Sequence, residues 1–139
     1  MKPKKKTIGY WKKKAWEKFS KWIRARDKNI CFTCGHVGEG SGIHAGHYIP
    51  RSLSGYLYFD ERNVHAQCYR CNIHLFGNAD EYAQRLGEEV VAALRKDKGK
   101  YHQWTEANLR DLIVKYERPY MDGGATEAID PKKVGGQPS

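Results

Sequence analysis

The sequence predicts a small α+β domain in which a four-cysteine zinc site holds a short β hairpin against a helix, with more helices on either side. Two cysteine pairs have the spacing of zinc-binding turns, Cys31-x-x-Cys34 and Cys68-x-x-Cys71. Strand-like segments lie between the pairs, and apolar residues recur at helical spacing before and after them. The chain has 139 residues and an apolar fraction of 40%. A domain with so small a core is typically stabilised by a metal.

The two cysteine pairs together supply the four thiolates of a tetrahedral zinc site. A site filled by four protein ligands has no open coordination position, so we expect this Zn²⁺ to be structural. A redox dithiol is the alternative, but it requires a CxxC turn at a helix N-terminus in a βαβ unit, which the pattern does not offer. His36 is a further candidate that could replace one cysteine ligand.

The chain divides by composition into a basic arm, a basic helix, a cysteine-rich core, a helical part and a tail rich in Gly, Pro and Lys, which we expect to be disordered. The expected ranges are 1–9, 10–28, 29–78, 79–120 and 121–139. In the basic helix, Trp11, Ala15, Phe19 and Trp22 recur every three to four residues. We expect this apolar face, tryptophans included, to pack into the core.

Within the core, residues 43–49 and 63–67 are expected strands, and Pro50 ends the first of them. A helix should start at the second cysteine pair. The later helices are expected from Ala79, with a break at Gly87, and from Thr105, which is a favourable N-cap.

Positive charge is concentrated at the start of the chain. Residues 1–28 hold twelve of the 25 Lys and Arg residues and only two acidic residues. Such a block favours nucleic acid as the partner, the alternative being a solubilising helix face. No apolar run approaches membrane length and no hydrophobic signal segment follows the basic start, so we expect an intracellular protein without membrane contact. The candidate DNA-binding residues are Lys12, Lys13, Lys14, Lys18, Lys21, Arg24, Arg51 and Arg70.

The histidines and asparagines around the hairpin form a candidate catalytic group. Hydrolysis of a phosphodiester needs a base for the attacking water and a cation for the phosphate and the leaving oxygen. His47, at the end of the first strand, is the predicted general base. Asn63 is placed to brace the following loop through backbone hydrogen bonds, and His65 is expected to pack or to contact phosphate. The candidate ligands of a catalytic metal are His44, Asn72 and His74.

Several strings in this region resemble the NinG/Rap family of lambdoid phage recombination endonucleases. They are His44-Ala-Gly-His47-Tyr, Phe59-Asp-Glu-Arg-Asn63-Val-His65-Ala-Gln-Cys68, Cys71-Asn72-x-His74 and Gly77-Asn78. The resemblance covers residues 10–120. The layout is more distantly similar to HNH nucleases and to phage endonuclease VII.

That likeness implies a ββα-metal (HNH, His-Me finger) core flanked by helices. His47 would be the first H of the motif, Asn63 its N and Asn72 its last position. Two positions depart from the pattern. Gly46 stands where many HNH enzymes have an acidic or histidine ligand, and His44 stands where NinG-like proteins tend to have Asp. Histidine favours softer ions than Mg²⁺, such as Mn²⁺.

The resemblance implies a DNA endonuclease that cuts branched recombination intermediates, Holliday junctions and D-loops, with Mg²⁺ or Mn²⁺ as the catalytic ion. A homodimer would make the paired cuts, phage recombination proteins would be its partners, and the host cytoplasm its location. Two alternatives stay open. The chain could be a zinc-stabilised nucleic-acid-binding module without catalysis, or a nonspecific or homing-type HNH nuclease.

Overall fold

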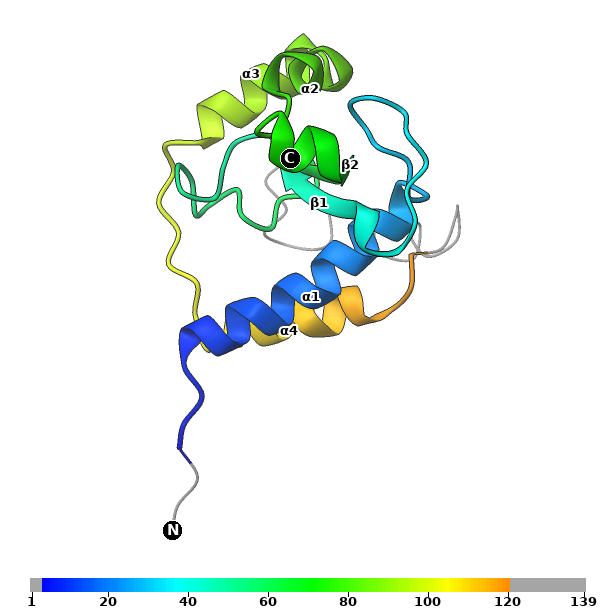
Figure 1. Ribbon diagram of the computed structural model, residues 1–139. Helices are drawn as coiled ribbons and strands as arrows, with labels where there is room; N and C mark the ends of the chain where they lie inside the picture. Colours follow the sequence, from blue (N-terminus) through cyan, green and yellow to red (C-terminus); the bar gives the residue numbers. More distant parts are fainter. Residues whose placement is uncertain (1–3, 121–139) are drawn as a thin grey trace.

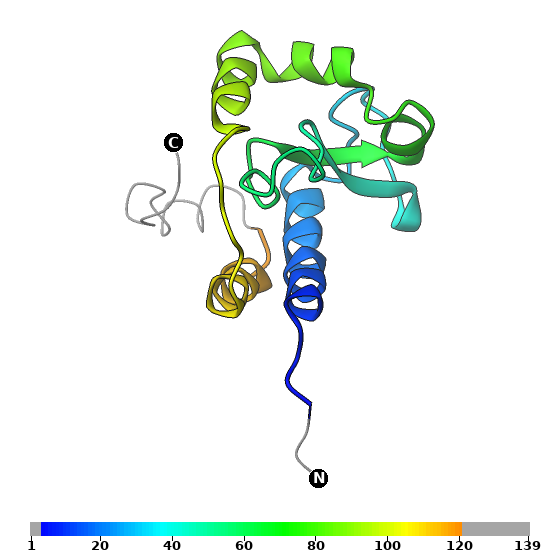
Figure 2. The same ribbon diagram turned by 90° about the vertical axis from the view of Figure 1, so that its left-hand side faces the viewer.

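The computed structural model describes residues 4–120 and shows a β hairpin between two pairs of helices (Figure 1). Helices α1 and α4 lie side by side on one side of the hairpin, and α2 and α3 lie on the other (Figures 1 and 2). The elements are α1 (Ile8–Arg26), the 3₁₀ turn η1 (Gly40–Gly42), β1 (Ile43–His47), β2 (Val64–Cys68), the π-helix η2 (Arg70–His74), α2 (Ala79–Leu86), α3 (Glu88–Asp97) and α4 (Glu106–Glu117).

Helix α1 forms where the apolar spacing predicts it. Thr7 caps the helix by accepting a hydrogen bond from the backbone N–H of Tyr10 at 3.1 Å. The helix buries Ala15, Phe19 and Ile23 completely. The apolar face packs against α4 and the hairpin in the main core, and the tryptophans Trp11, Trp16 and Trp22 line its margin. The expected packing role of this face is confirmed.

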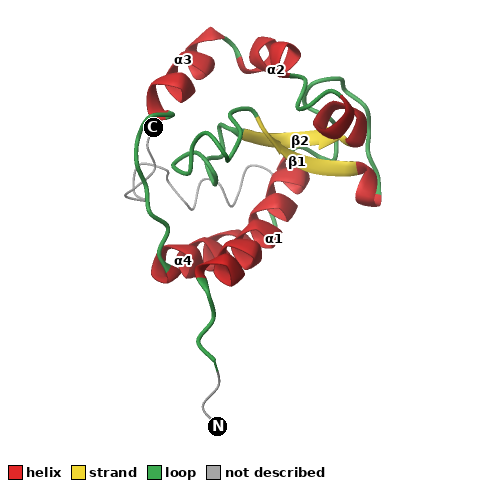
Figure 3. Cartoon of the chain, turned by 60° about the vertical axis from the view of Figure 1, so that its left-hand side comes forward, coloured by secondary structure: helices red, strands yellow, loops and turns green. Residues whose placement is uncertain are grey.

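The hairpin is a two-stranded antiparallel sheet (Figure 3). Its register pairs Ile43 with Cys68 and His47 with Val64. Because side chains alternate along a strand, His47 and its partner Val64 point toward α1, whereas Gly46 and its partner His65 lie on the opposite face, together with His44 and Gln67. This alternation decides which predicted site residues can meet.

The helices after the hairpin close the second side of the domain. The break expected at Gly87 is present, because that residue has φ +90° and separates α2 from α3. Leu94 of α3 packs with Ile49 and Leu57 in a small core beneath the loop that joins the strands. Thr105 caps α4 in a capping box with Asn108, as its residue type predicts.

The coarse fold class, a small α+β domain, is confirmed, but several details differ. Helix α1 begins at Ile8, inside the range expected to be a basic arm, because Thr7 is the cap. The helix expected at the second cysteine pair is only the five-residue π-helix η2. The structure therefore does not show the expected ββα-metal core. The tail expected at 121–139 lies outside the described residues.

The end of α1 is fastened to the hairpin by an ion pair. Arg26 and Asp27 form a bidentate pair at 2.8 and 3.1 Å. Asp27 also accepts the backbone N–H of Ala66 at 2.8 Å, and Arg26 donates to the carbonyls of Glu61 and Val64. These bonds join the helix to β2 and to the loop before it.

Replacing Asp27 with alanine should therefore destabilise the domain. The change leaves the Ala66 N–H and one side of the Arg26 guanidinium without their partner, at a cost of about 1–3 kcal/mol. Chemical denaturation monitored by circular dichroism measures this loss. The exposed residue Lys13 on the same helix supplies the control, since Lys13→Ala should change stability by less than about 0.5 kcal/mol. Equal effects of the two changes would contradict the fastening role.

Candidate functional site

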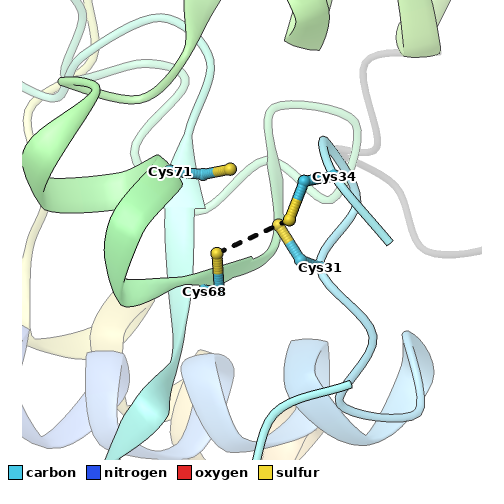
Figure 4. Close-up of side chains that lie close together, drawn as sticks. All are labelled: Cys31, Cys34, Cys68 and Cys71. Atoms are coloured by element: carbon cyan, nitrogen blue, oxygen red, sulfur yellow. Dashed lines mark hydrogen bonds between the residues drawn. The ribbon is translucent and has the colours of Figure 1, made fainter. Parts of the chain in front are cut away.

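The four cysteines converge on one point from three segments of the chain (Figure 4). Cys31 and Cys34 lie in the loop after α1, Cys68 ends β2, and Cys71 lies in η2. Their sulfur atoms all lie within 4.8 Å of one another, and Cys34 Sγ is 3.7 Å from Cys68 Sγ. Among residues 4–120 this is the one cluster of His, Cys, Asp or Glu side chains with metal-binding geometry.

This donor set fits zinc. Tetrahedral Zn–S bonds of about 2.3 Å place the sulfurs about 3.8 Å apart, which matches the Cys34–Cys68 separation. Burial would raise the pKa of the Cys31 thiol, but hydrogen bonds from the Thr33 hydroxyl and from backbone N–H groups lower it to about 6. Burial raises the pKa of the Cys34 thiol to about 12. Zinc binding must therefore displace protons from the cluster.

His47 occupies an aromatic niche between the hairpin and α1. Its ring stacks on Trp16 with centroids 4.9 Å apart and meets Tyr58 edge-on at 5.5 Å. Its Nε2 lies 2.9 Å from the backbone carbonyl of Tyr58. A carbonyl only accepts, so Nε2 carries the proton and Nδ1 is the nitrogen with the lone pair. Burial, with a contribution from the charge of Arg51, lowers the pKa of His47 below 6.5.

Two of the predicted DNA-binding cations lie close to Tyr58, the residue whose backbone carbonyl contacts this histidine. The Arg51 guanidinium lies 5.8 Å from the centre of the Tyr58 ring and donates to the Tyr58 hydroxyl at 3.1 Å. The Lys12 ammonium lies 6.0 Å from the same ring. The niche therefore combines a neutral imidazole with two positive charges supplied by α1 and by the loop after β1.

The candidate ligands His44 and Asn72 do meet. Asn72 Nδ2 lies 3.0 Å from His44 Nδ1. His74 is exposed and packs edge-on against Tyr69 at 5.1 Å, and the other neighbour of that tyrosine ring is His44 at 5.8 Å. In the described contacts, His74 therefore approaches this pair only through Tyr69.

His47 and Asn72 lie on opposite faces of β1, so the structure does not bring the predicted base and the predicted metal ligand into direct contact. The reason is the strand alternation, which turns His44 and Gly46 toward Asn72 and turns His47 toward Trp16. The two faces meet at the end of β1, where residues 46 and 47 are consecutive. In the described part of the chain, the edge of β1 away from β2 has no strand partner. A ligand at this edge could reach both faces.

Asn63 has the hydrogen bonds of a loop brace. It is fully buried, its Oδ1 accepts the backbone N–H of Ile49 at 2.8 Å, and its Nδ2 donates to the carbonyls of Ile49 and Leu57. It thereby closes the loop that carries Arg51 and Tyr58. His65 packs at 3.9 Å against Phe32, and burial lowers its pKa to about 4, so it is a neutral packing residue.

The other predicted DNA-binding residues are spread over α1 and η2. Lys13, Lys14 and Lys21 are exposed on α1, and Arg70 is exposed on η2. Lys18 and Arg24 are half-buried, and Lys18 pairs with Glu117 of α4 at 3.7 Å. None of the helices in residues 4–120 is long and apolar enough to cross a membrane.

Sequence reasoning missed two side chains of the His47 niche. Trp16 was expected only to pack in the core, and Tyr58 lies in a loop without a recognisable motif. A helical repeat identifies the buried face of α1, but it does not tell which tryptophan borders a histidine 31 positions later. The sequence held no signal for Tyr58.

Comparisons with known proteins place the chain among phage proteins. A family model described as bacteriophage lambda NinG protein matches residues 1–122. The chain is similar to protein ninG of Escherichia phage 933W, with 35% identity over 118 residues that cover 81% of this chain and 58% of the relative. For protein ninG of Salmonella phage P22 and of Escherichia phage lambda, the identities are 34% and 32%, each over 81% of this chain and 57% of the relative.

The chain thus spans somewhat more than half the length of these relatives. No solved structure matches it. The broader identification as a Rap-type, endonuclease VII-like HNH nuclease is wrong, because the matching family model and the relatives carry the NinG description alone.

The cysteine cluster should hold one tightly bound zinc ion per chain, and removing the ion should unfold the middle of the domain. The cluster joins the loop after α1 to β2 and η2, and a structural zinc of this kind contributes directly to folding. Metal analysis of the purified protein, followed by circular dichroism during chelation, measures both effects. Because the thiols must lose protons to bind the ion, zinc release should become easier as the pH falls.

A folded domain that contains no zinc and four free thiols would exclude this role. Cys68→Ser removes one ligand and should lower the zinc content, whereas Ser52→Ala, at an exposed position far in sequence from both pairs, should leave it unchanged.

Proposed function

The chain belongs to the phage lambda NinG family, and from this membership and the geometry at His47 we propose that it is a metal-dependent endonuclease. Its substrates would be branched DNA recombination intermediates such as Holliday junctions and D-loops. The observation that carries the proposal is the state of His47. It is a neutral imidazole whose proton is held on Nε2 by the Tyr58 carbonyl, and two cationic side chains approach the ring of that same tyrosine.

His47 acts as the general base. With Nε2 donating to the Tyr58 carbonyl, Nδ1 can accept the proton of a water that attacks the phosphorus. Trp16 holds the ring plane by stacking, so the direction of the lone pair is set before substrate binds. Burial keeps the imidazole neutral near pH 7, which is the form a base requires.

Arg51 and Lys12 bind the phosphate that is cut. Both cations lie within 6.0 Å of the Tyr58 ring, and the backbone carbonyl of the same residue orients His47. A phosphate held by the two cations is therefore brought to the base. Arginine also suits this task because its planar guanidinium can make two parallel hydrogen bonds to a phosphate.

A divalent cation would be held on the other side of β1 by Asn72 Oδ1, and His44 Nδ1 orients this amide by accepting from its Nδ2 at 3.0 Å. Such an ion neutralises charge on the phosphate and stabilises the leaving oxygen. A phosphodiester at the free edge of β1 would have His47 on one side and Asn72 on the other. The opposite placement of the two side chains is thus compatible with a base and a cation that act on opposite sides of one phosphate.

The preference for branched DNA is supported by the distribution of charge. The exposed lysines of α1 can bind phosphates but carry no information about bases, so they favour recognition of DNA shape over sequence. Resolving a junction requires two cuts, which a two-fold dimer can make. Helices α1 and α4 bury their apolar faces against each other within one chain, so a dimer would have to use other surfaces.

Substituting His47 should abolish cleavage of a four-way junction in Mg²⁺ or Mn²⁺. Loss of a general base lowers the rate about 10²- to 10⁴-fold. His47→Ala and His47→Gln are compared with wild type in single-turnover assays, and zinc content and circular dichroism establish that each variant is folded. The control is His36→Ala, because His36 is an exposed imidazole outside the niche and should be dispensable.

Wild-type protein that binds the junction but cuts no DNA in any divalent ion would instead be a binding module. Equal cutting of linear and branched DNA would indicate a nonspecific nuclease. Cleavage by His47→Ala at the wild-type rate would refute the assigned base while leaving the activity in place.

The cleavage rate should fall as the pH is lowered, but only at pH values below 6.5, because the pKa of His47 is lowered. Burial favours neutral His47, so the active form persists below the ordinary histidine pKa of 6.5 and is lost only as the pH falls through the lowered value. A pH profile of single-turnover rates between pH 5 and pH 8 should therefore have its acid limb below 6.5. An acid limb above 6.5 would contradict the proposed environment of the base.

A further inference from the structure

Gln67 is a fully buried side chain of β2 with one polar atom unsatisfied. Its Nε2 donates to the Gly77 carbonyl at 2.8 Å and to the Thr33 hydroxyl at 3.2 Å. Its Oε1 has no hydrogen-bond partner. The amide cannot be turned round to repair this, because the Gly77 carbonyl accepts only and therefore requires the nitrogen on its side. An unpaired buried acceptor is costly and needs a physical explanation.

The unpaired oxygen lies where Gly46 lacks a side chain. A Cβ at position 46 would lie 2.0 Å from Gln67 Oε1 and 2.9 Å from Asn72 Oδ1, so both amide oxygens lie close to this one point. Only glycine leaves room for this arrangement. The Asn72 amide has its nitrogen 3.0 Å from His44 Nδ1, so its oxygen is the end that faces Gly46.

We propose that Gln67 is a ligand of the divalent cation, and that its Oε1 and Asn72 Oδ1 form the protein side of the cation site beside Gly46, while His44 orients the Asn72 amide by accepting from its Nδ2. The inference rests on the proposed function in taking this ion to be the catalytic one. The site joins β2 and η2 beside β1, and both ligands are chain neighbours of cysteines of the cluster, Cys68 and Cys71.

The chemistry of the two oxygens indicates which ion they would bind. Amide oxygens are hard donors and suit Mg²⁺ or Mn²⁺. Neither amide is charged, so the site should bind the ion weakly until a DNA phosphate adds negative charge.

A weak contact between Gly46 Cα–H and Gln67 Oε1 is the other use this oxygen could have. In that case Gln67 would only support the Gly77 turn. The two readings differ in one measurable property, which is whether Gln67 changes the affinity for a cation in the absence of DNA.

The experiment measures Mn²⁺ binding to the zinc-loaded full chain by electron paramagnetic resonance of free Mn²⁺. Asn72→Asp supplies a carboxylate at the site and should tighten binding by at least about tenfold. Gln67→Met, which keeps the side-chain length but removes the oxygen, should weaken binding roughly tenfold in both the wild-type and the Asn72→Asp chain. The control Gln84→Glu adds the same charge at an exposed position of α2 and should leave Mn²⁺ binding unchanged.

Gly46→Ala provides a second route if Gln67→Met fails to fold. The Cβ added at position 46 forces the Gln67 oxygen away while Gln67 itself is kept. Mn²⁺ binding should weaken to a similar degree. Unchanged Mn²⁺ affinity in the folded variant overturns the inference. If wild type still cuts junctions in a His47-dependent way in that case, the proposed function survives without Gln67. If Gln67→Met weakens Mn²⁺ binding but wild type cuts nothing, the cation site stands and the nuclease fails.

Discussion

The cluster of four sulfur atoms is the constraint on which the rest of the domain depends. It joins a loop after α1 to the end of β2 and to η2, segments more than thirty residues apart in the chain. The sheet has only two strands, and such a hairpin is marginally stable by itself. Gln67 and Asn72 each adjoin a cysteine of the cluster, so the clamp also sets the position of the candidate cation ligands.

Helix α1 carries both the proposed DNA-binding lysines and a side chain that contacts the candidate base. Its exposed face carries lysines, and its other face supplies Trp16, which stacks on His47. Arg26 and Asp27 at its end bond to the strand that pairs with His47.

The proposed cation site and the candidate base lie on different sides of β1, and this separation has a chemical use. The cation side is polar and contains amide oxygens, whereas the base side is aromatic and keeps the imidazole neutral. A cation directly against His47 would compete for its lone pair. Placing the two on opposite faces of one strand keeps the base available while both remain within reach of the strand edge.

The sequence by itself determined the parts that depend on local spacing. The cysteine pairs predicted the metal cluster, the apolar repeat predicted α1, and Thr105 and Gly87 marked helix boundaries, because each signal lies within a few residues. The π-helix at Arg70–His74 was not foreseen, since a CxxC turn is compatible with several continuations.

Tertiary structure alone decided which distant side chains meet. It placed Tyr58 and Trp16 around His47, put Gln67 against Gly46, and set His47 and Asn72 on opposite faces of β1. These contacts depend on strand register and on how α1 packs on the hairpin. No short stretch of sequence encodes that geometry, because a shift of one residue in register would exchange the two faces.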